Sequence, residues 1–217
     1  MTNSMSRREE KAARRADLSG AGPVREERPP ARFPGATATF ALFGEVLLVG
    51  LLVTVGGILL VTLPAALAAG IRHLRRYLHA EASPHRQFWR DYMTALPGGL
   101  VVGGGALVLV LLLLLDIDLA NSGLPGGGAI AIVGWVGLAV VAVILLVTAG
   151  AWTPEGWRAA IGRAPGALAA DLPGALYLAA TAAFVCVVTW ALVPLVIPAL
   201  GCAALAVVAI PERRRLR

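Results

Sequence analysis

The stretch of sequence that decides the fold covers residues 44–77 and reads GEVLLVGLLVTVGGILLVTLPAALAAGIRHLRRY. With the residues before it, it forms an apolar block of 35 residues, 37–71, which ends at a cluster of arginines. A single helix of that length would measure about 52 Å. The hydrocarbon core of a bilayer is only about 30 Å thick. The block is therefore either one steeply tilted helix or a hairpin of two helices.

Two features inside this block favour the hairpin. Gly56 and Gly57 weaken a helix at that point, because glycine is a poor helix former. Thr62 followed by Pro64 is typical of a helix start, with the threonine as the cap and the proline in the first turn. We therefore expect two helices here, at about 39–60 and 62–79.

The composition of the whole chain indicates a membrane protein. Of its 217 residues, 58% are hydrophobic and 15% are charged, and the mean hydropathy is +0.76. A typical soluble domain is about 45–50% apolar and about 25% charged. The composition therefore excludes a disordered chain, a coiled coil and most soluble enzymes.

Three further apolar blocks complete an all-α bundle. Residues 97–115 and 126–151 are each long enough for one transmembrane helix, which needs about 20 residues. Residues 173–210 are long enough for two, and the prolines favour a division at Leu192–Pro194. We therefore predict a polytopic membrane bundle of six transmembrane helices. The membrane domain, 37–212, would contain spans at about 39–60, 62–79, 97–115, 127–150, 174–192 and 194–210.

The basic residues indicate the orientation of these spans. With six spans, all 19 lysines and arginines fall on one side, and the loop 116–128 on the other side carries two acids and no base. With a single first span, the arginines of 72–90 and of the C-terminus would lie opposite the N-terminal tail. Basic residues prefer the cytoplasmic side. We therefore expect a multi-pass protein of the cytoplasmic membrane with both termini in the cytoplasm.

The two ends of the chain are expected to lie outside the bundle. Residues 1–36 hold eight basic residues and four prolines, which is typical of a solvated, disordered arm. Adhesion of this arm to anionic lipid is the alternative. Residues 213–217 form a short basic tail. A nucleic-acid partner is not expected, because the sequence has no basic folded module to bind it.

Polar residues within the apolar runs are the candidates for an intramembrane site, and Glu45 and Thr62 are the first of them. Ionisable residues within spans often face a cavity or a partner, so Glu45 is a candidate proton or ligand contact. We favour the alternative, in which Glu45 lies near the cytoplasmic interface and either snorkels to it or pairs with Arg32 or with an arginine of 72–90. A polar path across the membrane would also draw on the threonines of the spans, which are Thr54, Thr62, Thr148, Thr181 and Thr189.

Two cytoplasmic connections combine aromatic and basic side chains. Residues 83–96 have the pattern of an interfacial helix that leads into the third span, and residues 152–172 begin with a helix start signal. Exposed aromatic residues in these connections would either dock a partner or anchor the protein at the lipid headgroups. The candidate docking or interface residues are Arg75, Arg76, Phe88, Trp89, Arg90, Trp152, Trp157 and Arg158.

No sequence motif indicates an enzyme, a cofactor or a metal. The nucleophile, zinc-protease and phosphate-loop motifs are absent, and His73 and His79 do not have the spacing of a helical zinc pair. We therefore expect no catalytic, cofactor-binding or metal-binding residue. The small residues of Gly99–Gly103 and Ala66–Gly70 favour helix packing within one chain, and a homo-oligomer is the alternative.

The layout resembles the YesL family of bacterial membrane proteins. The resemblance rests on Gly44–Glu45, a break at Thr62–Ala66, a small-residue helix that ends in Arg72–Arg76, and the aromatic–basic stretch Phe88–Arg90. It covers about residues 39–212, in layout more than in letters after the first part. The bias toward alanine, glycine and arginine looks like that of an actinobacterial sequence.

The resemblance implies a role but no catalytic site. Members of that family have no established biochemical activity and are often linked by gene neighbourhood to carbohydrate ABC transport systems. We therefore expect a non-enzymatic accessory of ABC-type solute uptake, with membrane lipids and ABC transporter subunits as its partners. The alternative is a stand-alone small transporter or channel.

Overall fold

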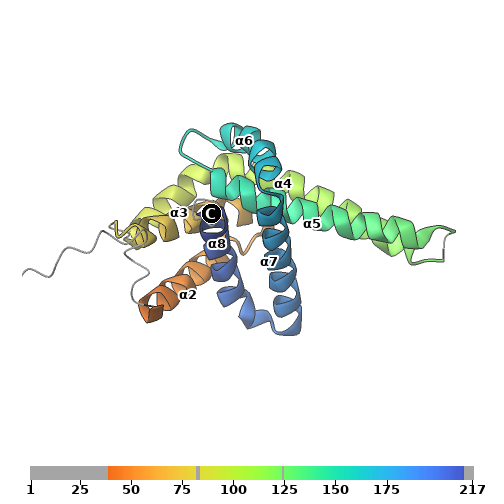
Figure 1. Cartoon of the computed structure of the whole chain (residues 1–217), viewed down its shortest axis with the longest axis horizontal. Helices are drawn as coiled ribbons and strands as arrows, with labels where there is room; N and C mark the ends of the chain where they lie inside the picture. The colour runs from red at the N-terminus through yellow and green to blue at the C-terminus, as the bar shows by residue number, and fades with distance from the viewer. Residues whose placement is uncertain (1–38, 82–83, 124, 213–217) are drawn as a thin grey trace, which may run out of the picture.

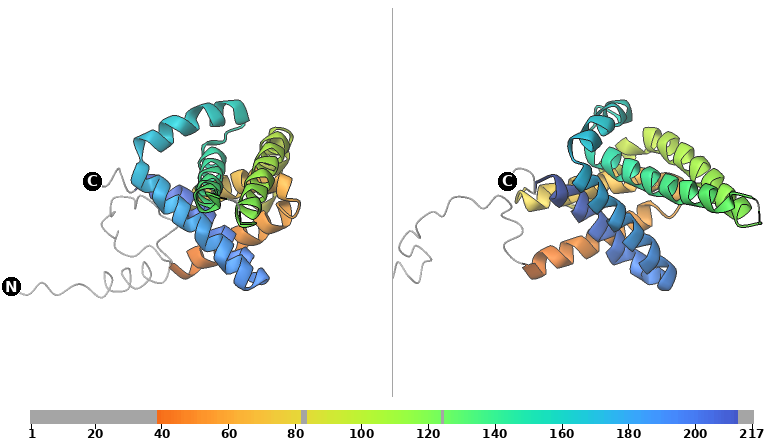
Figure 2. Two further views of the ribbon diagram at one scale, coloured as in Figure 1. Left: turned by 90° about the vertical axis from the view of Figure 1, so that its right-hand side faces the viewer. Right: turned by 45° about the vertical axis from the view of Figure 1, so that its right-hand side comes forward.

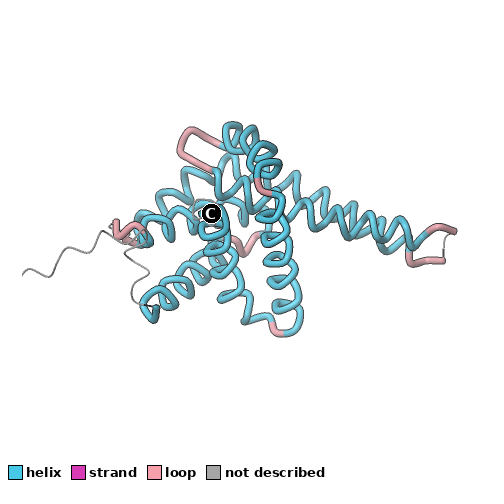
Figure 3. Tube along the Cα trace, viewed as in Figure 1, coloured by secondary structure: helices cyan, strands magenta, loops and turns pink. Residues whose placement is uncertain are grey.

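The computed structural model describes residues 39–81, 84–123 and 125–212, and within these ranges every regular element is a helix (Figures 1 and 3). The tails expected at 1–36 and 213–217 lie outside the described residues. The elements are α2 (Thr39–Gly56), η2 (Leu60–Thr62), α3 (Leu63–Leu78), α4 (His85–Ala120), α5 (Gly127–Ala151), α6 (Trp157–Ala170), α7 (Leu172–Ala191), η3 (Val193–Leu195) and α8 (Val196–Glu212).

Five of the described helices are long and apolar enough to cross a membrane. They are α2, α4, α5, α7 and the helical segment of residues 193–211. The all-α membrane class predicted from the sequence is therefore confirmed. The second predicted span is different, because α3 has only 16 residues and carries arginines in its last turn.

The first apolar block is broken into two helices, and the break lies where the glycines and Thr62 predict it. The Thr62 hydroxyl donates to the carbonyl oxygens of Gly56 and Leu59, each at 2.7 Å. The predicted role of Thr62 as a side-chain cap of the next helix is wrong, because the hydroxyl makes no cap hydrogen bond to α3. It closes the turn instead. The Tyr92 hydroxyl also donates to the Gly56 carbonyl, at 2.8 Å.

Helix α3 forms the centre of the molecule. It packs against α2, α4, α5 and α8, and most of its side chains are buried. Small residues make this close packing feasible, since a smaller side chain lets a neighbouring backbone approach. Gly70 lies against Val49 and Val53 of α2, and Gly99 of α4 lies against Ala65. The two predicted small-residue faces therefore pack within the chain.

Helix α4 joins two predicted elements into one. The interfacial helix expected at 83–96 and the third span expected at 97–115 form a single helix that continues through Pro97. Its C-terminal half packs against the N-terminal half of α5, where Gly134 lies against Ile117. This α4–α5 hairpin diverges from the α7–α8 pair in the views of Figures 1 and 2.

Helices α7 and α8 form a second hairpin, and the division predicted at Leu192–Pro194 is confirmed. Helix α8 also packs closely against α2, where Gly50 lies against the Ile197 carbonyl and Gly201 lies against the Val46 carbonyl. This order of contacts means that the two helices are antiparallel. The N-terminus of α2 and the C-terminus of α8 therefore lie at the same end of the molecule.

The described arginines gather at that same end, which we call the basic end. It comprises the C-terminal turns of α3, α5 and α8, the N-terminal turns of α4 and α7, and α6, which lies across the top of Figure 1. Contacts such as that of Gly150 with Val207 join these turns. The described arginines are Arg72, Arg75, Arg76, Arg86, Arg90, Arg158 and Arg163.

Candidate functional site

The last two turns of α3 carry most of the polar side chains in the interior of the basic end. Arg72 and Arg76 are four residues apart and share one face of the helix, whereas His73 and Arg75 point in other directions. They reach three neighbouring helices, α2, α4 and α5. Because α3 is central, one polar turn can connect all of them.

Glu45 is paired with His73. The Glu45 Oε1 atom and the His73 Nε2 atom are 2.6 Å apart, and the side chains are 19% and 0% exposed. The antiparallel α2–α3 hairpin brings the start of α2 beside the end of α3. The expected arginine partner of the 72–90 loop is therefore wrong, and Arg32 lies outside the described residues.

His85 extends this pair toward the surface. Its ring stacks on that of His73, with centroids 6.4 Å apart and an angle of 23° between the planes. His85 is exposed at the start of α4, whereas His73 is fully buried. A line of polar groups therefore runs from the surface through His73 to Glu45.

Thr62 does not join Glu45 in one site. Thr62 bonds to Gly56 at the C-terminal end of α2, and Glu45 is eleven residues earlier in that helix, a separation of about 16 Å along the axis. The Thr54 and Thr181 hydroxyls donate to the carbonyls of Gly50 and Tyr177 within their own helices. These hydroxyls stabilise local structure rather than form a polar path with Glu45.

Two arginines of α3 share one carboxylate of α4. The Arg76 Nη2 atom donates to Asp91 Oδ2 at 2.8 Å, and the Arg72 Nη1 atom is 3.7 Å from Asp91 Oδ1. The Arg72 guanidinium also lies over the ring of Trp152, 5.4 Å from its centroid. We call Arg72, Arg76, Asp91 and Trp152 the arginine cluster.

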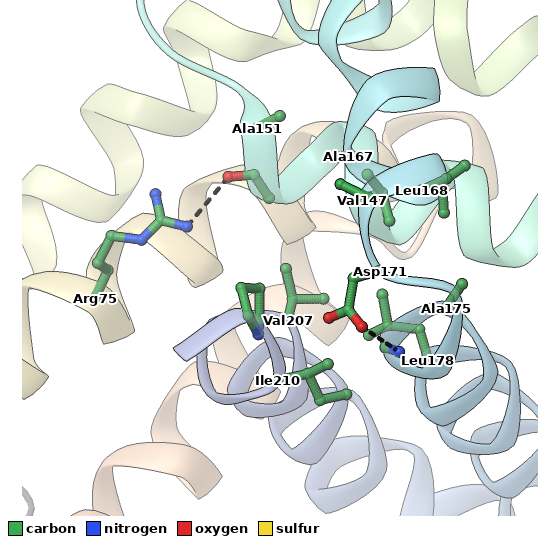
Figure 4. A pocket seen from close by; sticks show the side chains of 14 residues that line it. Arg75, Val147, Ala151, Ala167, Leu168, Asp171, Ala175, Leu178, Val207 and Ile210 are labelled. Carbon is green, nitrogen blue, oxygen red and sulfur yellow. Dashed lines mark hydrogen bonds between the residues drawn. The ribbon is translucent and has the colours of Figure 1, made fainter. Parts of the chain in front are cut away.

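Arg75 points toward α5 and a cavity. Its Nη2 atom donates to the carbonyl of Gly150 at 3.2 Å, near the C-terminal end of α5, where unpaired carbonyls favour a cation. The cavity holds about 580 Å³ and lies among α5, α6, α7 and α8 (Figure 4). Asp171 lines it as well and accepts a hydrogen bond from the Gly174 amide at 2.9 Å. The remaining lining is largely aliphatic.

The predicted docking aromatics are mostly buried, and the expectation that they are exposed is wrong for three of them. Phe88 is 0% exposed, Trp152 is 2% exposed and Trp157 is 7% exposed. Trp157 is buried because α6 packs on α4, where its Nε1 atom donates to the Ala95 carbonyl at 2.8 Å. Phe88 lies beside Gly70 of α3 instead. Trp89 keeps 36% of its surface exposed.

The basic members of the predicted docking set divide in the same way. Arg90 and Arg158 are exposed, whereas Arg75 and Arg76 are half-buried and bonded within the bundle. Sequence reasoning did not identify Asp91 or His73 as partners. The signal for His73 was available, because in a hairpin centred on Leu59 it lies at the same distance from the turn as Glu45.

In comparisons with known proteins, no family model, no curated protein and no solved structure matches the chain.

Proposed function

We propose that this chain is a non-enzymatic accessory of ABC-type solute uptake in the cytoplasmic membrane, as its resemblance to the YesL family implies. It would act by docking an ABC transporter subunit at the basic end. The observation that carries the proposal is a set of exposed basic and apolar side chains on α4 and α6 at that end. We call it the α4–α6 surface, and it consists of Arg86, Trp89, Arg90, Met93, Arg158 and Ile161.

The orientation of the chain supports a cytoplasmic position for this surface. Both described ends of the bundle, the N-terminus of α2 and the C-terminus of α8, lie at the basic end, and every described arginine lies there too. Arginine-rich ends of membrane proteins face the cytoplasm. Both termini would then be cytoplasmic, where ATP-binding subunits of ABC systems are found.

The α2–α3 hairpin would enter and leave the membrane on the cytoplasmic side, in place of two full passes. Its turn lies beside the middle of α4, since Val61 contacts Gly103. Helix α4 continues from there for 17 residues to Ala120, which is about 25 Å farther. The carbonyl of Gly56 in the turn is bonded by two hydroxyls, as irregular backbone at membrane depth requires.

The charge of the α4–α6 surface defines its partner. Arg86, Arg90 and Arg158 are exposed there, and Glu155 pairs at the surface with Arg163, at 3.6 Å, and accepts a hydrogen bond from Thr153. The partner surface would therefore be acidic, with a recess for the Trp89 ring. A Trp and Arg pair is a common source of binding energy in protein interfaces.

The test is affinity purification from the native host in mild detergent, followed by mass spectrometry. We expect stoichiometric recovery of ABC permease or ATPase subunits, and loss of most of that recovery in the double variant Trp89→Ala, Arg90→Glu. Trp190→Ala is the matched control, because Trp190 is also exposed, at 89%, but lies at the opposite end of α7. Equal recovery from the double variant and the control would contradict docking through this surface.

The second candidate function is a stand-alone transporter, and the buried Glu45–His73 pair favours it. Ionisable pairs among apolar helices are typical of ion pathways. The test is proton flux into liposomes that contain only this protein, followed with an internal pH-sensitive dye under an imposed membrane potential. Flux that Glu45→Gln abolishes would support the transporter, and flux no greater than that of empty liposomes would exclude proton transport by the chain alone.

A further inference from the structure

The arginine cluster carries more positive than negative charge. Arg72 and Arg76 both pair with Asp91, and no second carboxylate pairs with either of them among the described residues. The three side chains are largely withdrawn from solvent, with 27%, 13% and 13% of Arg72, Arg76 and Asp91 exposed. An excess cation in such a place is costly unless an anion accompanies it.

Three buried hydrogen-bond donors of the cluster have no acceptor among the described residues. They are Arg72 Nη1, Arg76 Nε and Trp152 Nε1. Buried polar atoms in native proteins nearly always have a hydrogen-bond partner. A group of buried donors without one therefore indicates that a bound acceptor belongs there. All three atoms are donors. Their side chains are neighbours, because the Arg72 guanidinium lies over the Trp152 ring and pairs with Asp91, as Arg76 does.

The chemistry that satisfies this cluster is an anion with several acceptor oxygens. A phosphate group fits both requirements, because it supplies the missing negative charge and accepts several hydrogen bonds at once from guanidinium groups. A water molecule would satisfy a donor but would leave the charge uncompensated. Arg72 is the most exposed of the three charged side chains, at 27%.

The position of the cluster indicates the source of the phosphate. Trp152 directly follows the last residue of α5, and Arg72 is in the polar half of α3, so the cluster lies where the apolar helices end at the basic end. In a bilayer this depth is that of the lipid phosphates. Basic pockets between helices on the cytoplasmic side commonly bind anionic headgroups.

We infer that the arginine cluster binds the phosphate headgroup of one anionic phospholipid. Arg72 and Arg76 compensate the charge, and the Trp152 indole donates a further hydrogen bond. This site differs from the α4–α6 surface in residues and in ligand, so it does not rest on the proposed docking function.

The binding test is native mass spectrometry of the full chain in non-ionic detergent, titrated with phosphatidylglycerol or phosphatidylcholine. We expect one phosphatidylglycerol to be retained, at least about tenfold more tightly than phosphatidylcholine, which corresponds to about 1.4 kcal/mol. Arg76→Gln should weaken this retention about tenfold. Arg163→Gln is the control, because Arg163 is a half-exposed arginine of the same end outside the cluster. Equal retention by both variants would overturn the proposal.

Two further measurements keep the inference testable if Arg76→Gln folds poorly. Trp152→Phe keeps an aromatic ring under Arg72 but removes one of the unsatisfied donors. Without lipid, the variant should therefore melt at or above the melting temperature of the wild type. With phosphatidylglycerol, it should melt below the wild type, because it lacks one hydrogen bond to the lipid. An unchanged order of melting temperatures would contradict the site. Millimolar inorganic phosphate is the last arm: if it displaces the lipid, the ligand is a free phosphate and the lipid source is overturned.

Discussion

Glu45 and His73 form a hydrogen-bonded pair inside an apolar hairpin. His73 is fully buried, and its Nε2 atom faces the Glu45 carboxyl group at 2.6 Å. A glutamate this deep in an apolar helix would be costly alone, and the imidazole reduces that cost. The pair therefore stabilises the hairpin irrespective of any role in transport.

This pair yields a prediction on stability. Glu45→Ala and His73→Ala are each expected to lower the free energy of unfolding by about 1–3 kcal/mol, because each removes the short hydrogen bond between two largely buried side chains. The double variant should lose about 1–3 kcal/mol less than the sum of the two single losses. Unfolding in mixed detergent micelles measures this. Glu155→Ala, at a side chain 76% exposed, should change stability by less than about 0.5 kcal/mol, and strictly additive losses would exclude a direct coupling.

Single residues also show what could be predicted from the sequence and what could not. Glu45 stands out in an apolar run, and the symmetry of the hairpin identifies its partner. The burial of Phe88 and Trp157 could not be predicted, because Phe88 is covered where α4 packs on α3 and Trp157 where α6 packs on α4 after α5 intervenes. An amphipathic pattern of aromatic and basic residues is the same whether its apolar side faces lipid, a partner or another helix of the chain.

At the level of helices, the contacts of glycines determine how closely neighbours approach. Gly103 and Gly104 are adjacent in α4, but only Gly103 meets a neighbour: a Cβ atom there would collide with the carbonyl of Val61. A Cβ atom at Gly104 would meet nothing within 4 Å. The turn between α2 and α3 therefore packs on a backbone surface that only glycine provides.

This difference predicts opposite results for two adjacent substitutions. Gly103→Ala should destabilise the protein by about 1–3 kcal/mol, because the carbonyl of the turn must move. Gly104→Ala should be neutral or should stabilise by up to about 1 kcal/mol, since alanine is the better helix former. Thermal unfolding of the two variants in detergent checks this. Similar melting temperatures would mean that the turn does not rest on Gly103.

The turn itself gives a third prediction. Thr62→Val keeps the shape of the side chain but removes the hydroxyl that bonds the carbonyls of Gly56 and Leu59, and we expect a loss of about 1–2 kcal/mol. Thr54→Val is the control, because the Thr54 hydroxyl only returns to Gly50 of its own helix, and its loss should cost about 0.5 kcal/mol or less. Equal melting temperatures for the two variants would mean that the Thr62 hydroxyl does not stabilise the turn more than the Thr54 hydroxyl stabilises its helix.

The elements were predictable where the chain carries local break signals. Two glycines and a Thr–x–Pro sequence mark the α2–α3 turn, and prolines mark the α7–α8 turn. Pro97 was misleading, because it lies inside the continuous helix α4 rather than at a boundary. The bounds of α3, Leu63–Leu78, agree with the helix expected at about 62–79. The bonds of its arginines to α4 and α5 could not be predicted, because they depend on how the helices pack.

For the whole molecule, the depth of the α2–α3 turn in the bilayer decides how many times the chain crosses it. The turn exposes Ile58, Leu59 and Leu60, at 80%, 65% and 65%. Apolar side chains at this exposure suit lipid rather than water. The tip of the α4–α5 hairpin is different, because it carries Asp116, Asp118 and polar turn residues. Only the second tip is therefore expected to reach water on the far side.

Cysteine labelling in cells distinguishes these depths. The native Cys186 and Cys202 are first replaced, since both are exposed on the bundle. Ser122→Cys, at the α4–α5 tip, should react with a membrane-impermeant maleimide in intact cells, and Gly162→Cys, exposed on α6, should react only after permeabilisation. Leu60→Cys should react in neither condition, because the turn stays in hydrocarbon. Labelling of Leu60→Cys from outside would mean that α2 and α3 each cross the membrane fully. Labelling of Gly162→Cys in intact cells would mean that the basic end faces the outside of the cell.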